Sequence, residues 1–246
     1  MNPLFPERTS LLATVLSAEE AMVAVAAGAG VIDVKNPLEG ALGAPAPSVI
    51  QAVRAITPSH IHVSAALGDM PFLPGTAALA AVGAAAAGAS IVKVGLYGPS
   101  NPEETLLLLE AAVGALRDHF PKTVLVAGAY ADAPRFGGID PLKVPECAAR
   151  TGVAGCLLDT FDKSSGQTLL DLMPLVMIDK FVSSCRERNL FSALAGSLGS
   201  DETVLLLPLM PDYIGYRGAL CEGGRTGRLS REKIRQISLA LTEGSR

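Results

Sequence analysis

The sequence predicts one α/β domain built as a closed (β/α)8 barrel, the TIM barrel. Its 246 residues, of which 49% are apolar and 18% charged, match the length of one such barrel. Short apolar runs alternate with helical patterns along the chain. No linker rich in Pro, Gly or Ser divides the sequence, so we expect residues 1–246 to form a single domain. A doubly wound open sheet is the alternative, but the glycine fingerprint after its first strand is missing.

Eight apolar runs have the length of buried strands. They cover residues 11–16, 31–35, 61–67, 90–96, 123–129, 155–160, 192–197 and 213–220. Eight helical patterns cover residues 18–27, 46–56, 75–87, 102–118, 141–150, 173–188, 200–207 and 230–242. Gly28, Gly88 and Gly152 each follow a helical pattern and precede a strand. Glycine is typical of this position because a helix C-cap needs a left-handed residue.

Composition excludes several classes of function. The net charge is −4, and no basic stretch interleaves with aromatic residues, so we expect no nucleic-acid partner. No uncharged apolar stretch reaches about 18 residues, which predicts no membrane span. The first residues lack a secretory signal, so we expect a cytoplasmic protein. The 4 cysteines and 3 histidines lack metal-ligand spacing, which predicts buried free thiols and no metal site.

Charged residues occur on three of the predicted strands. Asp33 and Lys35 share one face of a strand, because side chains alternate with a period of two, and the intervening apolar residues take the other face. The same alternation directs Lys93 into the barrel. Asp159 stands at the carboxyl end of its strand, and Lys163 follows in the loop. We therefore expect three lysines and two aspartates at the mouth of the barrel.

Charged groups on apolar strands are costly unless they are paired. One interpretation is a buried ion-pair network that only sets the register of the barrel. The other is amine catalysis, because a partly desolvated lysine crowded by other cations loses its proton and then attacks a carbonyl group. Asp33 can hold the amine or transfer its proton, and Lys93 can act as a base.

The last two predicted units carry a candidate phosphate site. Gly196 and Ser197 end the seventh strand, and Arg217 and Gly218 lie on the eighth. TIM barrels often bind phosphate with the loops after these two strands. The loop at 223–228 can contribute a further arginine.

Three further aspartates, Asp69, Asp132 and Asp212, lie near predicted strands. Asp side chains are common helix caps. These three residues can also reach the mouth of the barrel, but capping explains each of them as easily, so we assign them no role in the site.

Several segments together resemble the signature of one enzyme family. The block Asp33–Gly43 reads DVKNPLEGALG, and it is accompanied by VKVG around Lys93, LDT followed by Lys163, and YRGALC around Arg217. These segments are similar to the (5-formylfuran-3-yl)methyl phosphate synthases, also known as 4-(hydroxymethyl)-2-furancarboxaldehyde-phosphate (4-HFC-P) synthases. The resemblance spans nearly the whole chain. It implies a TIM-type barrel and a role in the synthesis of methanofuran, or of the related cofactor in methylotrophic bacteria.

The resemblance also implies a reaction and a set of roles. Two molecules of glyceraldehyde 3-phosphate condense to (5-formylfuran-3-yl)methyl phosphate with release of phosphate and water, which makes the enzyme a carbon–oxygen lyase acting on phosphates. Lys35 matches the Schiff-base lysine and Lys93 the proton acceptor. Asp33, Asp159 and Lys163 match further polar positions of the family's site. We expect no metal or organic cofactor, because the lysine itself supplies the electron sink.

Two other functions fit the same residues. A class I Schiff-base aldolase acting on a phosphorylated sugar shares the lysines and the phosphate loops, but it releases no inorganic phosphate. A binding protein without catalytic activity uses the lysines only to hold anions. Replacement of Lys35 by Arg separates this binding protein from both enzymes, because the charge is kept and imine chemistry is lost.

The alanine-rich segment 76–87 offers a flat apolar helix face. Such a face can pack against a second subunit, so we expect a homo-oligomer. The alternative is that the same alanines pack against the barrel of their own chain.

Overall fold

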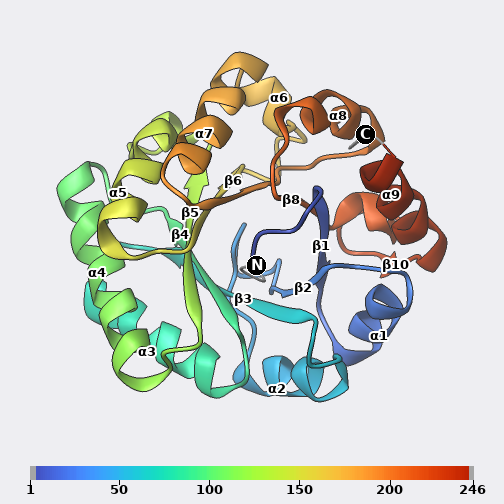
Figure 1. The fold of residues 1–246 in the computed structure, drawn as a ribbon, viewed down its shortest axis with the longest axis horizontal. Coiled ribbons are helices and arrows are strands. Elements are labelled where there is room, and N and C mark those ends of the chain that lie inside the picture. Colours follow the sequence, from blue (N-terminus) through green and yellow to red (C-terminus); the bar gives the residue numbers. More distant parts are fainter. Residues whose placement is uncertain (1–3, 244–246) are drawn as a thin grey trace.

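The computed structural model describes residues 4–243, in which eight parallel strands close into a barrel surrounded by helices (Figure 1). The predicted TIM barrel is confirmed. Residues 1–3 and 244–246 of the expected domain lie outside the described residues. The barrel strands are β1 (Ser10–Val15), β2 (Val31–Val34), β3 (His62–Met70), β4 (Ile91–Leu96), β5 (Val124–Tyr130), β6 (Gly155–Asp159), β7 (Phe191–Leu194) and β8 (Tyr213–Tyr216).

The helices form the outer layer. They are α1 (Ala18–Ala26), α2 (Pro47–Ile56), α3 (Pro74–Ala86), α4 (Pro102–His119), α5 (Val144–Thr151), α6 (Leu169–Leu172), α7 (Leu175–Glu187), α8 (Ser200–Leu206) and α9 (Arg231–Glu243). The predicted C-cap glycines at 28, 88 and 152 all have positive φ angles. Among residues 4–243, no helix combines the length and the apolarity needed to cross a bilayer.

Two predicted boundaries differ from the structure, and some short elements were not predicted. The helix expected over 173–188 corresponds to α7 and begins at Leu175, because Met173 and Pro174 are extended. The short helix α6 ends just before this range and was not predicted. The eighth strand ends at Tyr216 instead of residue 220, and a 3-10 helix follows over Gly218–Leu220. A short hairpin of β9 (Cys221–Glu222) and β10 (Arg228–Leu229) then precedes α9.

The apolar residues divide into two layers, as the strand period of two requires. Ile32 and Val34 of β2 face the helices, and so do Val92 and Val94 of β4. Alternate strand residues fill the interior of the barrel, among them Leu12, Val31, Ala66, Ile91, Val126, Leu157, Phe191 and Tyr213. Asp33 and Lys93 lie on the interior face and are buried.

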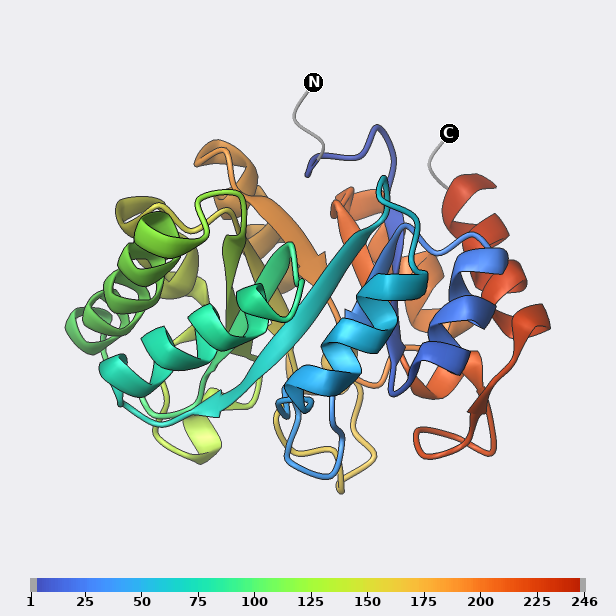
Figure 2. The same ribbon diagram turned by 90° about the horizontal axis from the view of Figure 1, so that it is seen from below.

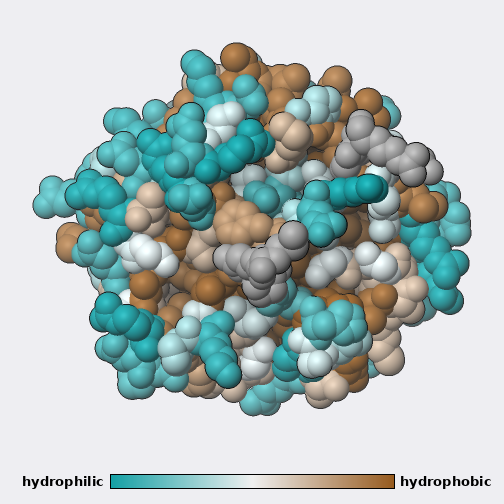
Figure 3. All heavy atoms as spheres, in the orientation of Figure 1, coloured by the Kyte–Doolittle hydropathy of each residue, from teal (hydrophilic) through white to brown (hydrophobic). Residues whose placement is uncertain are grey.

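The two ends of the barrel differ. At the amino ends of the strands, the rings of Phe191 and Tyr213 pack edge to face with centroids 5.6 Å apart, and the hydroxyl of Tyr213 donates to the carbonyl of Leu4 at 3.0 Å. This face has hydrophilic residues around much of its periphery (Figure 3). The β2–α2 loop, the β6–α6 loop and the β9–β10 hairpin all lie at the opposite end (Figure 2).

The alanines of α3 pack within the chain. Ala77, Ala81, Ala84 and Ala85 are buried in the core shared by the barrel and the helices. Leu79, on the outer side of the helix, is 77% exposed. Packing against the chain's own barrel therefore accounts for the small residues, and the homo-oligomer stays a prediction.

Candidate active site

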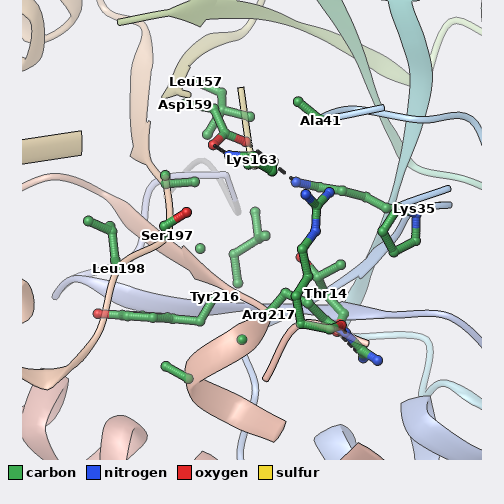
Figure 4. Close-up of a pocket in the computed structure, with 18 of the residues that line it drawn as sticks. Thr14, Lys35, Ala41, Leu157, Asp159, Lys163, Ser197, Leu198, Tyr216 and Arg217 are labelled. Atoms are coloured by element: carbon green, nitrogen blue, oxygen red, sulfur yellow. Dashed lines mark hydrogen bonds and ion pairs between the residues drawn. The ribbon is translucent and has the colours of Figure 1, made fainter. Parts of the chain in front are cut away.

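A cavity of about 440 Å³ occupies the carboxyl end of the barrel (Figure 4). Eight of the nine predicted site residues line it, namely Lys35, Lys93, Asp159, Lys163, Gly196, Ser197, Arg217 and Gly218. The ninth, Asp33, is fully buried and bonded to Lys93. The barrel thus gathers residues from both halves of the chain at one pocket.

Lys35 is the first residue after β2, and its ammonium lies between two carboxylates. Its Nζ is 3.7 Å from Oδ2 of Asp33 and 3.6 Å from Oδ2 of Asp159, and its side chain is 11% exposed. Lys35 and Asp159 point toward each other in Figure 4. Asp33 shares a strand face with Lys35, whereas Asp159 comes from β6. The amine is therefore held in place and still reachable from the cavity.

Asp33 is the centre of a buried polar cluster. Its Oδ1 accepts hydrogen bonds from Ser64 at 2.7 Å and from Lys93, and its Oδ2 accepts one from Thr14 at 3.1 Å. Burial alone would raise the pKa of Asp33, but Lys93 and Lys35 outweigh this effect and the pKa lies below its usual value. Asp33 is therefore an anion in the barrel core.

Thr14 and Ser64 were not predicted as site residues. The register of the barrel pairs Asp33 with Thr14 on one side and with Ser64 on the other, so the three side chains lie in one row across β1, β2 and β3. Thr14 and Ser64 are both polar residues on the inward face of strands next to β2, and this pattern could have predicted their contact with Asp33. The prediction also needs the register of the strands, which the sequence pattern does not specify.

Lys93 is the most buried cation of the site, with a side chain only 2% exposed. Burial lowers its pKa to about 8, although Asp33 opposes this shift, and the nearby Lys35 lowers the pKa further. An amine with this pKa exchanges protons readily near neutral pH. Lys93 is therefore suited to acid–base chemistry.

Asp159 forms the second carboxylate of the site, together with Lys163. Its Oδ1 accepts from Nζ of Lys163 at 2.5 Å and from the N–H of Thr160 at 2.8 Å. Burial raises the pKa of Asp159, but Lys163 and Lys35 lower it more, to about 2. Asp159 thus stays ionised at neutral pH and supplies a fixed negative charge beside Lys35.

Asp69 does not cap a helix, so that interpretation was wrong. It lies within β3 and accepts hydrogen bonds from the N–H groups of Ala41 at 2.8 Å and Leu42 at 3.0 Å, and from the hydroxyl of Tyr130. Gly40 approaches the same carboxylate, with a φ of +136°, and a Cβ atom there would lie 2.0 Å from Oδ2 of Asp69. Asp69 therefore holds the β2–α2 loop, which follows Lys35.

Asp132 and Asp212 also bind backbone rather than cap helices. Asp132 accepts from the N–H groups of Phe161 at 2.7 Å and Asp162 at 2.8 Å, so it holds the β6–α6 loop that carries Lys163. Asp212 accepts from the N–H of Ser192 at 2.7 Å, which links β7 to β8 at the other end of the barrel.

The predicted phosphate loops reach the cavity. Gly196 has a φ of +119°, and Ser197 follows with a φ of +53°. A Cβ atom at Gly196 would lie 2.8 Å from Cγ2 of Thr160, so glycine is required there. Gly218 begins the 3-10 helix after β8. These residues line the cavity together with Lys35 and Lys93, and their binding of phosphate stays a prediction.

Arg217 has a different environment from the one expected of a phosphate ligand. Its guanidinium has five N–H donors. Nη1 and Nη2 form a bidentate ion pair with Glu20 at 2.6 and 3.0 Å. Further bonds go to the carbonyls of Arg225 from Nε (3.0 Å), Thr14 from Nη1 (3.2 Å) and Gly227 from Nη2 (2.9 Å). All five donors are therefore engaged by the protein, and Arg217 connects β8 to α1 and to the hairpin.

The cysteines take no part in the cavity. All four are free and buried, as predicted, and burial raises the pKa of the Cys147, Cys156 and Cys221 thiols, which makes them poor nucleophiles. Within the described part of the chain, no three His, Cys, Asp or Glu side chains lie close enough together to hold a metal ion.

Replacing Arg217 by Met should destabilise the fold. The substitution leaves the partly buried Glu20 without its cationic partner and three carbonyls without their donor, so we expect a loss of about 3–5 kcal/mol in the free energy of unfolding. Urea denaturation measures this loss, and the exposed Arg228→Met serves as control. A loss below about 1 kcal/mol would contradict the structural role of Arg217.

Replacing Asp69 or Asp132 by Ala should release one loop each. We expect amide hydrogen exchange to speed up at least about tenfold at Ala41 and Leu42 in Asp69→Ala, and at Phe161 and Asp162 in Asp132→Ala. Each variant is the control for the other. Exchange that speeds up equally at both loops in either variant would indicate general destabilisation instead.

Comparisons with solved structures agree with the barrel. KGPDC of Streptococcus mutans superposes with a TM-score of 0.66 at 13% identity and covers 96% of this chain and 98% of its own. Phosphoribosyl anthranilate isomerase of Thermus thermophilus gives a TM-score of 0.62 at 17% identity, covering 96% and 99%. At these identities the likeness establishes the fold alone.

Comparisons of sequence are more specific. The (5-formylfuran-3-yl)methyl phosphate synthase of Methanothermobacter thermautotrophicus is 44% identical over 233 residues, which cover 94% of this chain and 98% of that protein. The enzyme of the same name from Methanocaldococcus jannaschii is 43% identical, covering 92% and 97%. The family model for 4-HFC-P synthase matches residues 11–238. With matches over almost its whole length, this chain belongs to the 4-HFC-P synthase family of enzymes.

Proposed function

We propose that this enzyme condenses two molecules of glyceraldehyde 3-phosphate to (5-formylfuran-3-yl)methyl phosphate, through a Schiff base on Lys35. The observation that carries the proposal is the position of the Lys35 amine, 3.7 Å from Asp33 and 3.6 Å from Asp159 at the wall of a cavity that also contains Lys93 and Lys163. The family relationship supports the substrate and the product. The product would serve the synthesis of methanofuran or of its methylotroph counterpart.

The first step forms the imine. The neutral Lys35 amine attacks C1 of the aldehyde, and the carbonyl oxygen leaves as water. The resulting iminium is cationic, and the two carboxylates within 4 Å of Nζ stabilise it. Because the pKa of Asp159 is about 2, this residue is an anion throughout and contributes electrostatically rather than by proton transfer. The iminium then acts as the electron sink that acidifies the C–H bond at C2, so no cofactor is needed for this step.

The second step removes a proton from C2. Lys93 is the candidate base, because its pKa of about 8 leaves part of it neutral at pH 7–8. The enamine expels the phosphate from C3, with the electron pair of the C–O bond leaving on oxygen, or attacks the aldehyde of the second substrate. Ring closure and dehydration complete the furan. In either order, two trioses lose one phosphate and two molecules of water, with no net oxidation.

Replacement of Lys35 tests the proposal. With glyceraldehyde 3-phosphate, the wild-type protein should release inorganic phosphate in proportion to a new product with the mass of the furan aldehyde. Lys35→Arg keeps the charge but cannot form the imine, so we expect phosphate release to fall at least about 1,000-fold while the triose phosphate still binds. Phosphate assay, mass spectrometry and calorimetry measure the three quantities.

Other outcomes would redirect the assignment. Condensation by the wild type without phosphate release would indicate an aldolase. Binding without turnover in the wild type would indicate a binding protein. Full activity of Lys35→Arg would exclude the Schiff base at this residue.

The pH dependence tests Lys93. If its neutral form is the base, kcat/KM should rise about tenfold per pH unit and level off near the Lys93 pKa of about 8. Asp33 holds that pKa up against the effect of burial, so Asp33→Asn should move the inflection to lower pH in whatever activity remains. Initial rates of product formation from pH 6.5 to 10 measure both profiles. A wild-type profile that is flat or falls over this range would rule out Lys93 as the base.

A further inference from the structure

Arg225 is a cation of the cavity that has no part in the imine and proton-transfer steps proposed for Lys35 and Lys93. It lies between β9 and β10 in the hairpin after β8, is half-buried, and lines the same cavity as Lys35. Its guanidinium donates to the carbonyl of Gly40 at 3.1 Å. Among residues 4–243, Arg225 makes no further side-chain hydrogen bond and no ion pair. Four of its five donors are thus available to a ligand.

In the part of the chain that the structure describes, the other cations of the cavity, unlike Arg225, have carboxylate partners. Lys93 is hydrogen-bonded to Asp33, and Lys163 to Asp159. Arg217, the arginine that the sequence pattern favoured for phosphate, has all of its donors engaged. Arg225 therefore differs from these three cations, because a half-buried guanidinium without a carboxylate partner gains most from an anionic ligand.

The position of Arg225 links it to Lys35. Gly40, which accepts its hydrogen bond, belongs to the β2–α2 loop that begins at Lys35. Burial lowers the pKa of Arg225, whereas Asp159 and Asp69 oppose that shift, which places the guanidinium within the electrostatic reach of both carboxylates. Asp159 is also the carboxylate 3.6 Å from Nζ of Lys35. Arg225 and Lys35 therefore line the same cavity, and the bond to Gly40 connects Arg225 to the loop that follows Lys35.

The proposed reaction requires two phosphate sites, because each turnover begins with two phosphorylated trioses. The wall of Gly196, Ser197 and Gly218 can hold one phosphate with backbone groups. The other phosphate is attached to C3 of the triose on Lys35, only two carbons from the imine carbon. Its site must therefore lie close to Lys35, and the planar fork of an arginine matches phosphate oxygens in pairs.

We propose that Arg225 binds the phosphate group of the triose attached to Lys35, the group that is expelled from C3. This inference rests on the proposed function. Arg225 orients the C3–O bond and stabilises the negative charge that the departing oxygen acquires. Its bond to Gly40 connects the hairpin to the loop that follows the Schiff-base lysine. This bond holds the phosphate site and the imine site in a fixed position relative to each other.

Borohydride trapping of the imine tests the proposal with two probes that differ only in the phosphate. Glyceraldehyde 3-phosphate and D-glyceraldehyde are each titrated against the full-length protein, and reduction at Lys35 is quantified by mass spectrometry. The variants are Arg225→Gln, which removes the charge, and Arg225→Lys, which keeps it. Arg228→Gln, an exposed arginine of the same hairpin, is the matched control.

In Arg225→Gln we expect half-maximal trapping of glyceraldehyde 3-phosphate to need about 10–100 times more substrate. Trapping of D-glyceraldehyde should stay within about twofold of the wild type, because this probe has no phosphate to lose. Arg225→Lys should recover part of the loss, and Arg228→Gln should change neither probe. An equal loss for both probes would show that Arg225 only supports the loop, and no loss for either would also overturn the proposal.

Calorimetric titration with inorganic phosphate separates this inference from the proposed function. If the wild type traps neither aldehyde at Lys35, the Schiff-base function fails, but the anion site can still be measured. Phosphate binding that is weakened about tenfold or more in Arg225→Gln, and unchanged in Arg228→Gln, would support the site in that case. Equal phosphate binding by the wild type and Arg225→Gln would overturn it.

Discussion

The buried carboxylate of Asp33 is the interaction on which the site depends. An ionised aspartate in a barrel core is costly unless every oxygen is satisfied. Here Ser64 and Thr14 donate from the neighbouring strands, and Lys93 donates from β4. The same charge keeps Lys93 from losing more of its basicity to burial. Without Asp33, the barrel would contain a buried lysine with no anion and an amine at position 35 with one carboxylate fewer.

Two further carboxylates each anchor one loop beside the site. Asp69 binds successive N–H groups of the β2–α2 loop, and Asp132 binds successive N–H groups of the β6–α6 loop. Each holds the segment next to a site lysine, although neither lines the cavity. This arrangement organises the site before substrate arrives, so less binding energy is needed to order the loops.

The sequence predicted what depends on local periodicity. Alternation along a strand placed Asp33 and Lys35 on one face, and the repeated strand–helix pattern predicted the barrel that brings Asp159 beside them. It did not predict contacts between distant segments. The pair of Arg217 and Glu20 joins residues 197 positions apart, so no local pattern predicts it, and the place of the arginine on the eighth strand favours a phosphate ligand instead. The β9–β10 hairpin was missed because strands of two residues are too short to show a pattern.

The two arginines near β8 show how a role follows from the partners of a side chain rather than from its position. Both line the cavity and both follow the last barrel strand. Arg217 is bound by Glu20 and three carbonyls, so a phosphate there would have to displace bonds that connect β8 to α1 and to the hairpin. Arg225 would gain a phosphate while keeping its bond to Gly40. Most charged side chains of the site are paired within the protein, whereas the guanidinium of Arg225 keeps donors that no described residue engages. This difference is the reason why we propose Arg225 as the group that binds an anionic substrate.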